Sequence, residues 1–432
     1  MLILLLAGCR RSDYIIVQSE TITDLGGGTG TTTWTNDRSY LIDGFVFVND
    51  GQTLTIEAGT VIRATSGQGS LSSALIVARG GHIIAEGTSA EPIIFTVEGD
   101  DLEGSVPVDA RGLWGGLIVL GQAPINTDAG EDMIEGIPLS EPRGVYGGFD
   151  EDDNSGILRY ISIRHGGTNI GEGNEINGLT LGGVGRQTIV ENIEVIANAD
   201  DGVEFFGGTV NCRNIVVSYC GDDAFDIDQG YRGKCQFLLG ITSSYSDKGI
   251  ECSGGLQPLQ LLPDAFPHFY NVTLIGDRTP GGKPLIDFYS FGAGHIRNSY
   301  FAYPDKGIAV SHAGTDGDAW SMFQNGALTL KHNEFFTADG MLDMYCYNEL
   351  NDAFLTEDAI LADSLATWKN TYSDPLNLSS GNLNILPEYT QFDDLAPFSS
   401  DWYEVVSYKG AFGSENWTEG WTLLDKEGLP EE

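Results

Sequence analysis

A short acidic motif recurs along the chain at nearly constant spacing. It begins at Asp200 as DDGVEFFG, returns at Asp222 and Ser246, and has a fainter copy at residues 305–311. Each copy joins short strands through Gly or Asx turns. A unit of this size cannot bury its own apolar face, so it must stack on its neighbours to form a continuous core. The repeats therefore predict a solenoid.

Short apolar strands bounded by turn residues extend this pattern toward the N-terminus, at Thr53–Ile62, Ala74–Ala78 and Trp114–Gly121. We expect an all-β chain in which residues 40–350 form a right-handed parallel β-helix. An antiparallel sandwich is the alternative, but sandwiches rarely repeat one turn motif at a fixed period. An acidic, Gly-rich insertion at residues 128–154 interrupts the coils, and such loops commonly carry binding groups.

Several phrases of the sequence resemble a broad set of bacterial, Bacteroidota-like β-helix lipoproteins and secreted proteins. These phrases are Leu54–Ile62, Trp114–Gly116, Asn177–Gly183, the Asp-Asp-Gly turn, Gly410–Gly413 and Trp417–Thr422. The resemblance covers about residues 40–425 of the chain. It implies the fold and carries little information about activity.

The chain is strongly acidic. It has 62 acidic and 22 basic residues, which give a formal net charge of −40. Nucleic acid needs a basic binding face, so this excess argues against nucleic acid as a partner. It favours a secreted protein that meets divalent cations or basic partners.

The first nine residues, MLILLLAGC, resemble a lipoprotein lipobox, which implies that Cys9 carries a lipid. Arg10 replaces the Asp typical of inner-membrane retention, and Ser12-Asp13 resembles a surface-export signal. The resemblance implies a membrane anchor at Cys9 and an outer-membrane, surface-exposed location in the cell envelope. We expect residues 10–39 to form a flexible tether, because they contain a Gly run and a Thr run.

Behind the solenoid the pattern changes, and we expect residues 351–432 to cap its open end. Residues 356–370 have the apolar spacing of an amphipathic helix. Aromatic residues follow, at Trp402, Tyr403, Tyr408, Phe412, Trp417 and Trp421. A cap is the favoured interpretation of this tail, and an aromatic platform for sugars is the alternative.

The cysteines match no zinc-binding spacing. Cys212 and Cys235 occupy equivalent positions in successive coils. Stacked positions are about 4.8 Å apart, close to the lower range of disulfide Cα spacing. A disulfide between Cys212 and Cys235 and two free thiols are both compatible with this spacing.

Four carboxylates fall at equivalent positions of successive coils. Apolar residues flank each of them, so period-two alternation turns the flanks inward and the acids outward. The outward column is Thr180, Glu204, Asp226, Glu251, Asp287 and Ala309. Like charges at one-coil spacing repel one another, and hard cations take clustered carboxylate oxygens.

We therefore expect the four acids of this column to point to solvent and to bind calcium. The predicted metal ligands are Glu204, Asp226, Glu251 and Asp287. Asp228 adds a carboxylate on the same face, so the candidate ligand-binding residues are Glu204, Asp226, Asp228 and Glu251. The alternative is a solvated acidic face whose turn acids only form Asx turns.

A weaker resemblance points to catalysis. Asn198-Ala199-Asp200 and Gly221-Asp222-Asp223 are similar to the Asn-Thr-Asp and Gly-Asp-Asp motifs of polygalacturonases, which are also β-helices. The resemblance implies catalytic roles for Asp200, Asp222 and Asp223. The Gly-His-Gly and Arg-Ile-Lys motifs of that family are missing from this chain, which puts the activity in doubt.

The sequence thus favours a lipid-anchored β-helix that binds an extended ligand without cleaving it. A glycan, an envelope polymer or a partner protein would suit the long face of a solenoid. A polysaccharide hydrolase or lyase is the first alternative, and a structural or adhesive spacer is the second.

Overall fold

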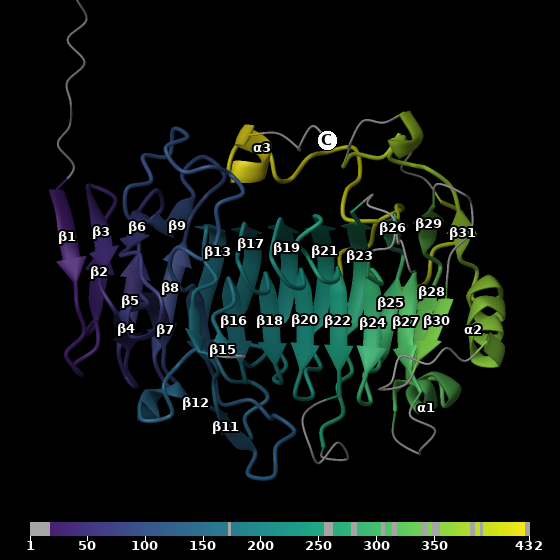
Figure 1. Ribbon diagram of the computed structural model, residues 1–432, viewed down its shortest axis with the longest axis horizontal. Coiled ribbons are helices and arrows are strands. Elements are labelled where there is room, and N and C mark those ends of the chain that lie inside the picture. Colours follow the sequence, from purple (N-terminus) through teal and green to yellow (C-terminus); the bar gives the residue numbers. More distant parts are fainter. Residues whose placement is uncertain are drawn as a thin grey trace, which may run out of the picture.

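The structure is a computed structural model. It describes residues 18–171, 174–254, 262–277, 283–303, 307–312, 318–337, 344–347, 355–380, 385–388 and 392–427. Within these residues the chain winds into a long stack of coils whose strands pair in parallel with the strands of the next coil. Figure 1 shows the stack from the side, with β1 at one end and α2 at the other. The parallel β-helix expected from the repeats is confirmed.

One ten-stranded sheet forms the first face of the stack. Its strands are β4 (Phe45–Val48), β7 (Ala74–Val77), β10 (Leu117–Leu120), β16 (Leu179–Gly182), β18 (Val203–Phe206), β20 (Phe225–Asp228), β22 (Ile250–Ser253), β24 (Ile286–Tyr289), β27 (Ile308–Ser311) and β30 (Met344–Tyr347).

A seventeen-stranded sheet forms the second and third faces. The second face contains β2 (Thr32–Trp34), β5 (Thr53–Ile56), β8 (His82–Glu86), the first halves of β13 (Gly156–Arg164), β17 (Ile189–Ile196), β19 (Asn211–Ser218), β21 (Lys234–Ile241) and β23 (His268–Ile275), and then β25 (Gly294–Arg297) and β28 (Leu328–Lys331). The third face contains β1 (Gln18–Ile22), β3 (Arg38–Ile42), β6 (Val61–Ala64), β9 (Ile93–Val97), the second halves of the same five long strands, and then β26 (Tyr300–Ala302), β29 (Glu334–Phe336) and β31 (Thr371–Tyr372).

Each long strand bends where the second face meets the third. The bend residue has a positive φ, between 51° and 61°, at Tyr160, Asn192, Asn214, Phe237 and Asn271. Asn tolerates this left-handed conformation better than most residues, which explains why it recurs at the corner.

The remaining elements lie outside the coils. Two antiparallel hairpins pair β11 (Glu131–Met133) with β12 (Val145–Gly147) and β14 (Asn169–Gly171) with β15 (Asn174–Glu175). The helices are η1 (Gly69–Leu71), η2 (Pro142–Gly144), α1 (Ala319–Gln324), α2 (Leu355–Thr367), η3 (Leu378–Ser380) and α3 (Leu423–Glu427).

The core fills the interior of the stack with the inward-facing residues of every coil. On the first face these include Val203, Phe205, Phe225 and Ile227, all at most 1% exposed. Alternation along the strands therefore assigns the inward face as expected. No helix among the described residues has both the length and the apolar run needed to cross a bilayer.

The N-terminal boundary differs from expectation. The segment expected to be a tether, residues 10–39, contains β1, β2 and the start of β3, which pair in parallel with later coils. Their inward side chains are buried, Trp34 and Tyr40 among them, and the two rings stack with centroids 4.9 Å apart. The described part of this segment is thus the first turn of the solenoid. Cys9 and the rest of residues 1–17 lie outside the described residues.

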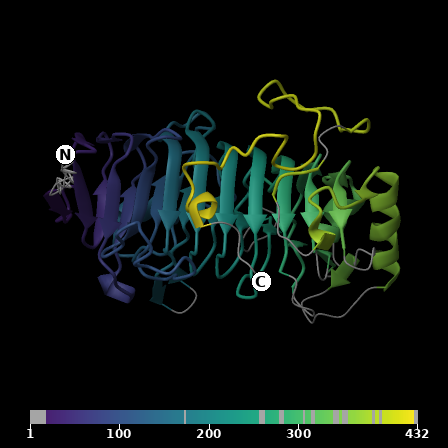
Figure 2. The same cartoon turned by 90° about the horizontal axis from the view of Figure 1, so that it is seen from above.

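The C-terminal segment also differs from the expected cap. Among its described residues, α2 lies at the end of the stack, where it contacts β30 and buries Leu361 and Leu365, and β31 pairs with β29 as the last strand of the third face. Residues 392–427, which we call the return segment, run back along the seventeen-stranded sheet, as Figures 1 and 2 show. Its aromatic residues pack against the flank of the stack, so they do not form an exposed platform for sugars. Tyr403, Phe412 and Trp421 are all buried.

Side chains at the corner of the stack hold the return segment by its backbone. Gln236 accepts a hydrogen bond from the Glu404 N–H and donates one to the Glu404 carbonyl, both at 2.8 Å. Asn298 makes the same pair of bonds with Ala396, at 2.7 and 3.0 Å. The buried Glu194 carboxylate accepts the N–H groups of Leu423 and Leu424, at 2.8 and 2.9 Å. Buried polar side chains thus find their partners in a distant part of the chain.

The disulfide between Cys212 and Cys235 is absent from the structure. The two residues are direct neighbours in register, as expected, but both thiols are free and buried. In-register side chains on parallel strands point the same way, and their spacing is near the lower limit for a disulfide. Cys235 instead has the Tyr231 hydroxyl 3.3 Å from its sulfur.

Candidate functional site

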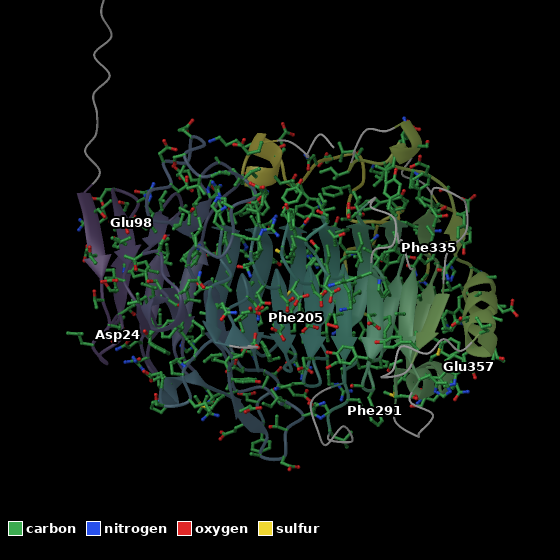
Figure 3. All side chains as sticks on the ribbon, viewed as in Figure 1. Asp24, Glu98, Phe205, Phe291, Phe335 and Glu357 are labelled. Atoms are coloured by element: carbon green, nitrogen blue, oxygen red, sulfur yellow. The ribbon has the colours of Figure 1, made fainter. Side chains whose placement is uncertain are left out.

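The strand carboxylates of the first face lie in one column. The register pairs Thr180 with Glu204, Glu204 with Asp226, Asp226 with Glu251, and Glu251 with Asp287. The expectation that all four acids point freely into solvent is wrong, because Glu204 and Asp287 are only 6% and 7% exposed. Asp226 and Glu251 are half-buried. Oxygen atoms crowd this region around the labelled Phe205 in Figure 3.

A second column of side chains lies in the turns just before these strands. Asp201 accepts the backbone N–H of Asp223 at 2.8 Å, and Asp223 accepts the backbone N–H of Lys248 at 2.6 Å. One oxygen of each turn acid therefore joins its coil to the next, which differs from the local Asx turn expected as the alternative. The second oxygen of each carboxylate remains available to the site.

The two columns, together with the neighbouring turn acids Asp200, Asp222 and Asp247, form the acidic cluster. Four sets of three carboxylates have ligand atoms within 4.8 Å of one another, and consecutive coils supply them. The sets are Asp200–Asp201–Asp222, Asp201–Glu204–Asp226, Asp222–Asp223–Asp247 and Asp223–Asp226–Glu251. Asp201, Asp222, Asp223 and Asp226 each belong to two sets, and Asp226 connects the set that contains Glu204 with the set that contains Glu251.

The insertion at residues 128–154 contributes a carboxylate that the sequence did not identify. It covers the first face through Tyr146, whose ring packs edge-on against Phe206 and whose hydroxyl donates to Gln229 at 2.5 Å. Glu135 accepts a hydrogen bond from the Asn177 amide at 3.0 Å, and the same amide reaches Glu204. The acidic composition of the insertion was the only signal for this contact.

Lysines neutralise one half of the acidic cluster. Lys248 contacts Asp247 at 2.7 Å and Glu251 at 3.0 Å, and Lys283 contacts Asp247 at 2.6 Å. Burial disfavours the charged form of Lys248, but Asp223, Glu251 and Asp247 raise its pKa overall. Lys248 was not among the predicted site residues, although it stands at the turn position of Asp201 and Asp223, one coil further on.

The other half has no such partner, and we call it the base-free set. It consists of Glu135, Asp200, Asp201, Glu204 and Asp226. None of these acids forms an ion pair with a lysine or arginine among the described residues. Burial, followed by repulsion from neighbouring carboxylates, raises the pKa of Asp200 to about 8. Burial also raises the pKa of Glu135 to about 7 and places the pKa of Glu204 and Asp226 well above the usual range.

Two buried oxygen atoms at this set lack a hydrogen-bond donor. One is Oδ1 of Asp226 and the other is Oδ1 of the fully buried Asn177. A buried acceptor without a partner costs free energy, and a ligand that supplies a positive charge or a donor would recover it. The base-free set can hold a hard cation, or it can retain protons and act as an acid.

The structure brings together most, but not all, of the predicted site residues. Asp200 and Asp222 share one set, and Asp222 and Asp223 share another. Asp228 belongs to none of the sets, and one of its oxygens accepts from Ser253 at 2.5 Å. Asp287 also stands outside them, where the Tyr347 hydroxyl donates to its carboxylate at 2.9 to 3.0 Å.

The comparisons with known proteins agree with this architecture. The family model of the pectate-lyase-like β-helix domain matches residues 26–374, which begins ahead of the expected solenoid and includes the whole acidic cluster. No curated protein and no solved structure matches the chain. A β-helix of this type fits a polysaccharide-related role. Because the match covers most of the sequence, the chain belongs to the pectate-lyase-like β-helix family.

Proposed function

We propose that this protein binds an extended glycan along its first face, through a calcium ion held by the acidic cluster, without cleaving the glycan. The observation that carries the proposal is the set Asp201–Glu204–Asp226, whose oxygens lie within 4.8 Å and have no basic partner among the described residues. Half-buried Glu251 and Asp228 flank this set on the same face.

Calcium suits this site for electrostatic reasons. Clustered carboxylates that cannot all ionise must keep protons or take up a cation. Calcium accepts six to eight oxygen ligands in flexible geometry, so three carboxylates leave coordination positions open. Sugar hydroxyls are neutral oxygen ligands that can fill such positions. The partly exposed Asp200 lies next to the set and can accept hydrogen bonds from a bound sugar.

The proposal includes location. We propose that a lipid on Cys9 anchors the protein in the outer membrane and exposes it at the cell surface. The support is the sequence MLILLLAGC, together with the acidity of the chain. A long solenoid attached at one end would present its first face to polymers of the envelope, to a partner protein or to glycans outside the cell.

A binding experiment tests the function. Neutral and acidic polysaccharides are titrated into the protein in calcium and in EDTA, and new reducing ends are measured in the same samples. We expect binding that depends on calcium and no increase in reducing ends. Asp226→Asn should weaken binding, whereas Glu98→Gln, an exposed acid away from the cluster (Figure 3), should not. Binding that is equal in EDTA would contradict the calcium site.

Hydrolysis or elimination of a polysaccharide is the second candidate, and one observation favours it. Glu135 and Asp200 have pKa values of about 7 and 8, so they can donate a proton near neutral pH. Under this alternative Asp200, Asp222 and Asp223 carry the chemistry. New reducing ends that appear with the wild-type protein and disappear in Asp200→Asn would favour catalysis over binding.

A further inference from the structure

The second face has a different chemical character between β19 and β28. The register aligns its outward side chains in two columns. One column is Asn211, Lys234, His268, His295 and Thr329, and the other is Arg213, Gln236, Tyr270, Arg297 and Lys331. Neither column contains an acid, although acids outnumber bases by 62 to 22 in the whole chain.

The cations of this face have no acidic partners among the residues that the structure describes. Nine other lysines and arginines form ion pairs with carboxylates: Arg38, Arg79, Arg143, Arg159, Arg186, Lys248, Lys283, Lys409 and Lys426. The four cations of the two columns form none: Arg213, Lys234, Arg297 and Lys331. Neither does Arg232, which precedes β21 and whose charge acts on His268. Together with His268 and His295 we call these five cations the basic face. Their charge is not neutralised within the described structure.

Buried nitrogen atoms on the basic face also lack partners. They are Nε of Arg213, Nε of Arg297 and Nδ1 of His268. Burial lowers the pKa of His268 to about 4, and the further contributions all come from Arg297, Lys234 and Arg232. The same combination of burial and nearby cations lowers the pKa of His295 to about 4. The surroundings of both imidazoles are therefore electropositive.

Aromatic rings hold the long side chains of the basic face in place. Arg213 lies over the ring of Trp402 at 4.8 Å, and its guanidinium donates to the Trp402 carbonyl at 2.6 Å. Arg297 donates to the Tyr270 hydroxyl at 3.0 Å. Lys331 lies over Trp368 at 5.4 Å. Side chains fixed in this way lose less conformational entropy when they bind a ligand.

We propose that the basic face is a second binding surface, which takes an acidic glycan: a polysaccharide carrying carboxylate, sulfate or phosphate groups. The cations stand in two groups, Arg213 with Lys234 on β19 and β21 and Arg297 with Lys331 on β25 and β28, and a linear anionic chain could contact both. Between the two groups the return segment covers Gln236 and Tyr270. Arginine can bind the oxygens of all three anions in bidentate geometry. The opposing acidic cluster does not prevent this, because salt screens charges beyond about 8 to 10 Å.

A glycan fits this face better than a lipid surface does. The large apolar side chains that the described structure exposes are Leu25, Leu71, Leu139, Phe149, Tyr245, Leu262, Leu355, Ile360, Tyr372 and Val405. None of them lies on β19, β21, β23, β25 or β28. Peripheral membrane binding uses apolar insertion together with charge, and these strands offer only charge and hydrogen bonding.

The test uses defined polymers and two double variants, of which one removes positive charge and the other removes negative charge. Dextran sulfate, polygalacturonate and neutral dextran are titrated into the full chain at physiological salt. Comparing the two anionic polymers shows whether sulfate or carboxylate is preferred. Arg232→Gln with Lys234→Gln should weaken anionic binding by about tenfold. Asp401→Asn with Glu404→Gln removes two exposed acids of the return segment beside Arg213 and Gln236 and should strengthen it.

Three controls make the outcome decisive. Arg186→Gln removes an ion-paired arginine elsewhere and should leave binding unchanged. Glu98→Gln, an exposed acid away from the cluster, should also leave it unchanged, and all titrations are run in EDTA, which removes any calcium-dependent binding at the acidic cluster. Melting temperatures verify that each variant is folded. Equal binding of neutral dextran, equal binding of single-stranded DNA or of anionic vesicles, or undiminished binding by the Arg232 and Lys234 double variant would overturn the proposal.

Discussion

Asp226 shows how one side chain can determine the behaviour of a whole cluster. It belongs to two of the carboxylate sets, and one of its oxygens has no donor. Its register neighbours are Glu251 on one side and Glu204 on the other. Removing its charge while keeping its shape therefore changes repulsion and cation binding in opposite directions.

We expect Asp226→Asn to be at least as stable as the wild type in EDTA, because it removes repulsion among buried carboxylates. Adding calcium should raise the stability of the wild type more than that of the variant. A cation that binds only the folded state contributes about 2.7 kcal/mol at a hundredfold excess over Kd. Thermal melts in EDTA, calcium and sodium at equal ionic strength measure the difference. Identical effects of calcium and sodium would show that the cluster binds no specific ion.

Glu135 makes stability depend on pH in a defined window. Its folded pKa is about 7, against 4.5 for an unperturbed glutamate, so the native state holds an extra proton between these values. Stability in EDTA should therefore be full near pH 4.5 and should fall as the pH rises to 7. Glu135→Gln should flatten this part of the profile. Urea unfolding at stepped pH provides the measurement, and an unchanged slope in the variant would contradict the assignment.

Residue patterns could predict the register of the acids but not their burial. Alternation and repeat length were sufficient to align Glu204, Asp226 and Glu251. The cover over Glu204 comes from Asn177, in the turn of the preceding coil, and from Glu135 of the insertion. The repeat does not encode the Glu135 contact, because that contact depends on how a long insertion folds back over the coils.

At the scale of elements, the return segment is the largest departure from expectation. The aromatic residues near the C-terminus were predicted to cover the end of the solenoid, where an open end needs protection. The polar side chains that hold the segment, such as Gln236, Asn271 and Asn298, appear in the sequence only as isolated residues within apolar strands. Their partners are backbone groups, which carry no sequence signature.

Glu194 offers a direct test of the return segment. Its buried carboxylate accepts two N–H groups at the start of α3, and glutamine offers only one acceptor oxygen. We expect Glu194→Gln to lower the free energy of unfolding by about 2 kcal/mol. Glu191→Gln on the same strand breaks a half-exposed contact with Arg159 and should cost less than about 1 kcal/mol.

Urea unfolding and limited proteolysis of the return segment distinguish the two variants. The Glu194 variant should be cut first near α3, and the Glu191 variant should resist like the wild type. If both variants unfold at the same urea concentration, the Glu194 carboxylate does not hold the return segment more strongly than an ordinary surface contact would.

At the scale of the whole molecule, charge of opposite sign is separated onto different faces. The first face carries the acidic cluster, and the second face carries the basic face between β19 and β28. Two polymers of different chemistry could then lie along one solenoid without competing. The proposed anchor would fix how both faces are presented to the cell exterior.

The anchor leads to a prediction about the intact protein in cells. Cys9→Ser removes the thiol that would receive the lipid, so the protein should move from the membrane fraction to the soluble fraction. Cys346→Ser, which alters a buried cysteine of the solenoid, serves as the control and should not change the fractionation. Membrane retention of the Cys9 variant would rule out lipid anchoring at this residue.

The return segment also changes how the solenoid can come apart. A stack whose coils contact only their neighbours can unfold one coil at a time from either end. Here one stretch of chain is bonded to coils from β17 to β29, through residues such as Glu194, Thr273 and Glu334. Opening one of these coils therefore strains bonds to several others. Lys426 of the same segment also contacts Leu102 and Glu103, which follow β9. The central part of the molecule should therefore melt as one cooperative unit, while the coils before β8 remain free to fray.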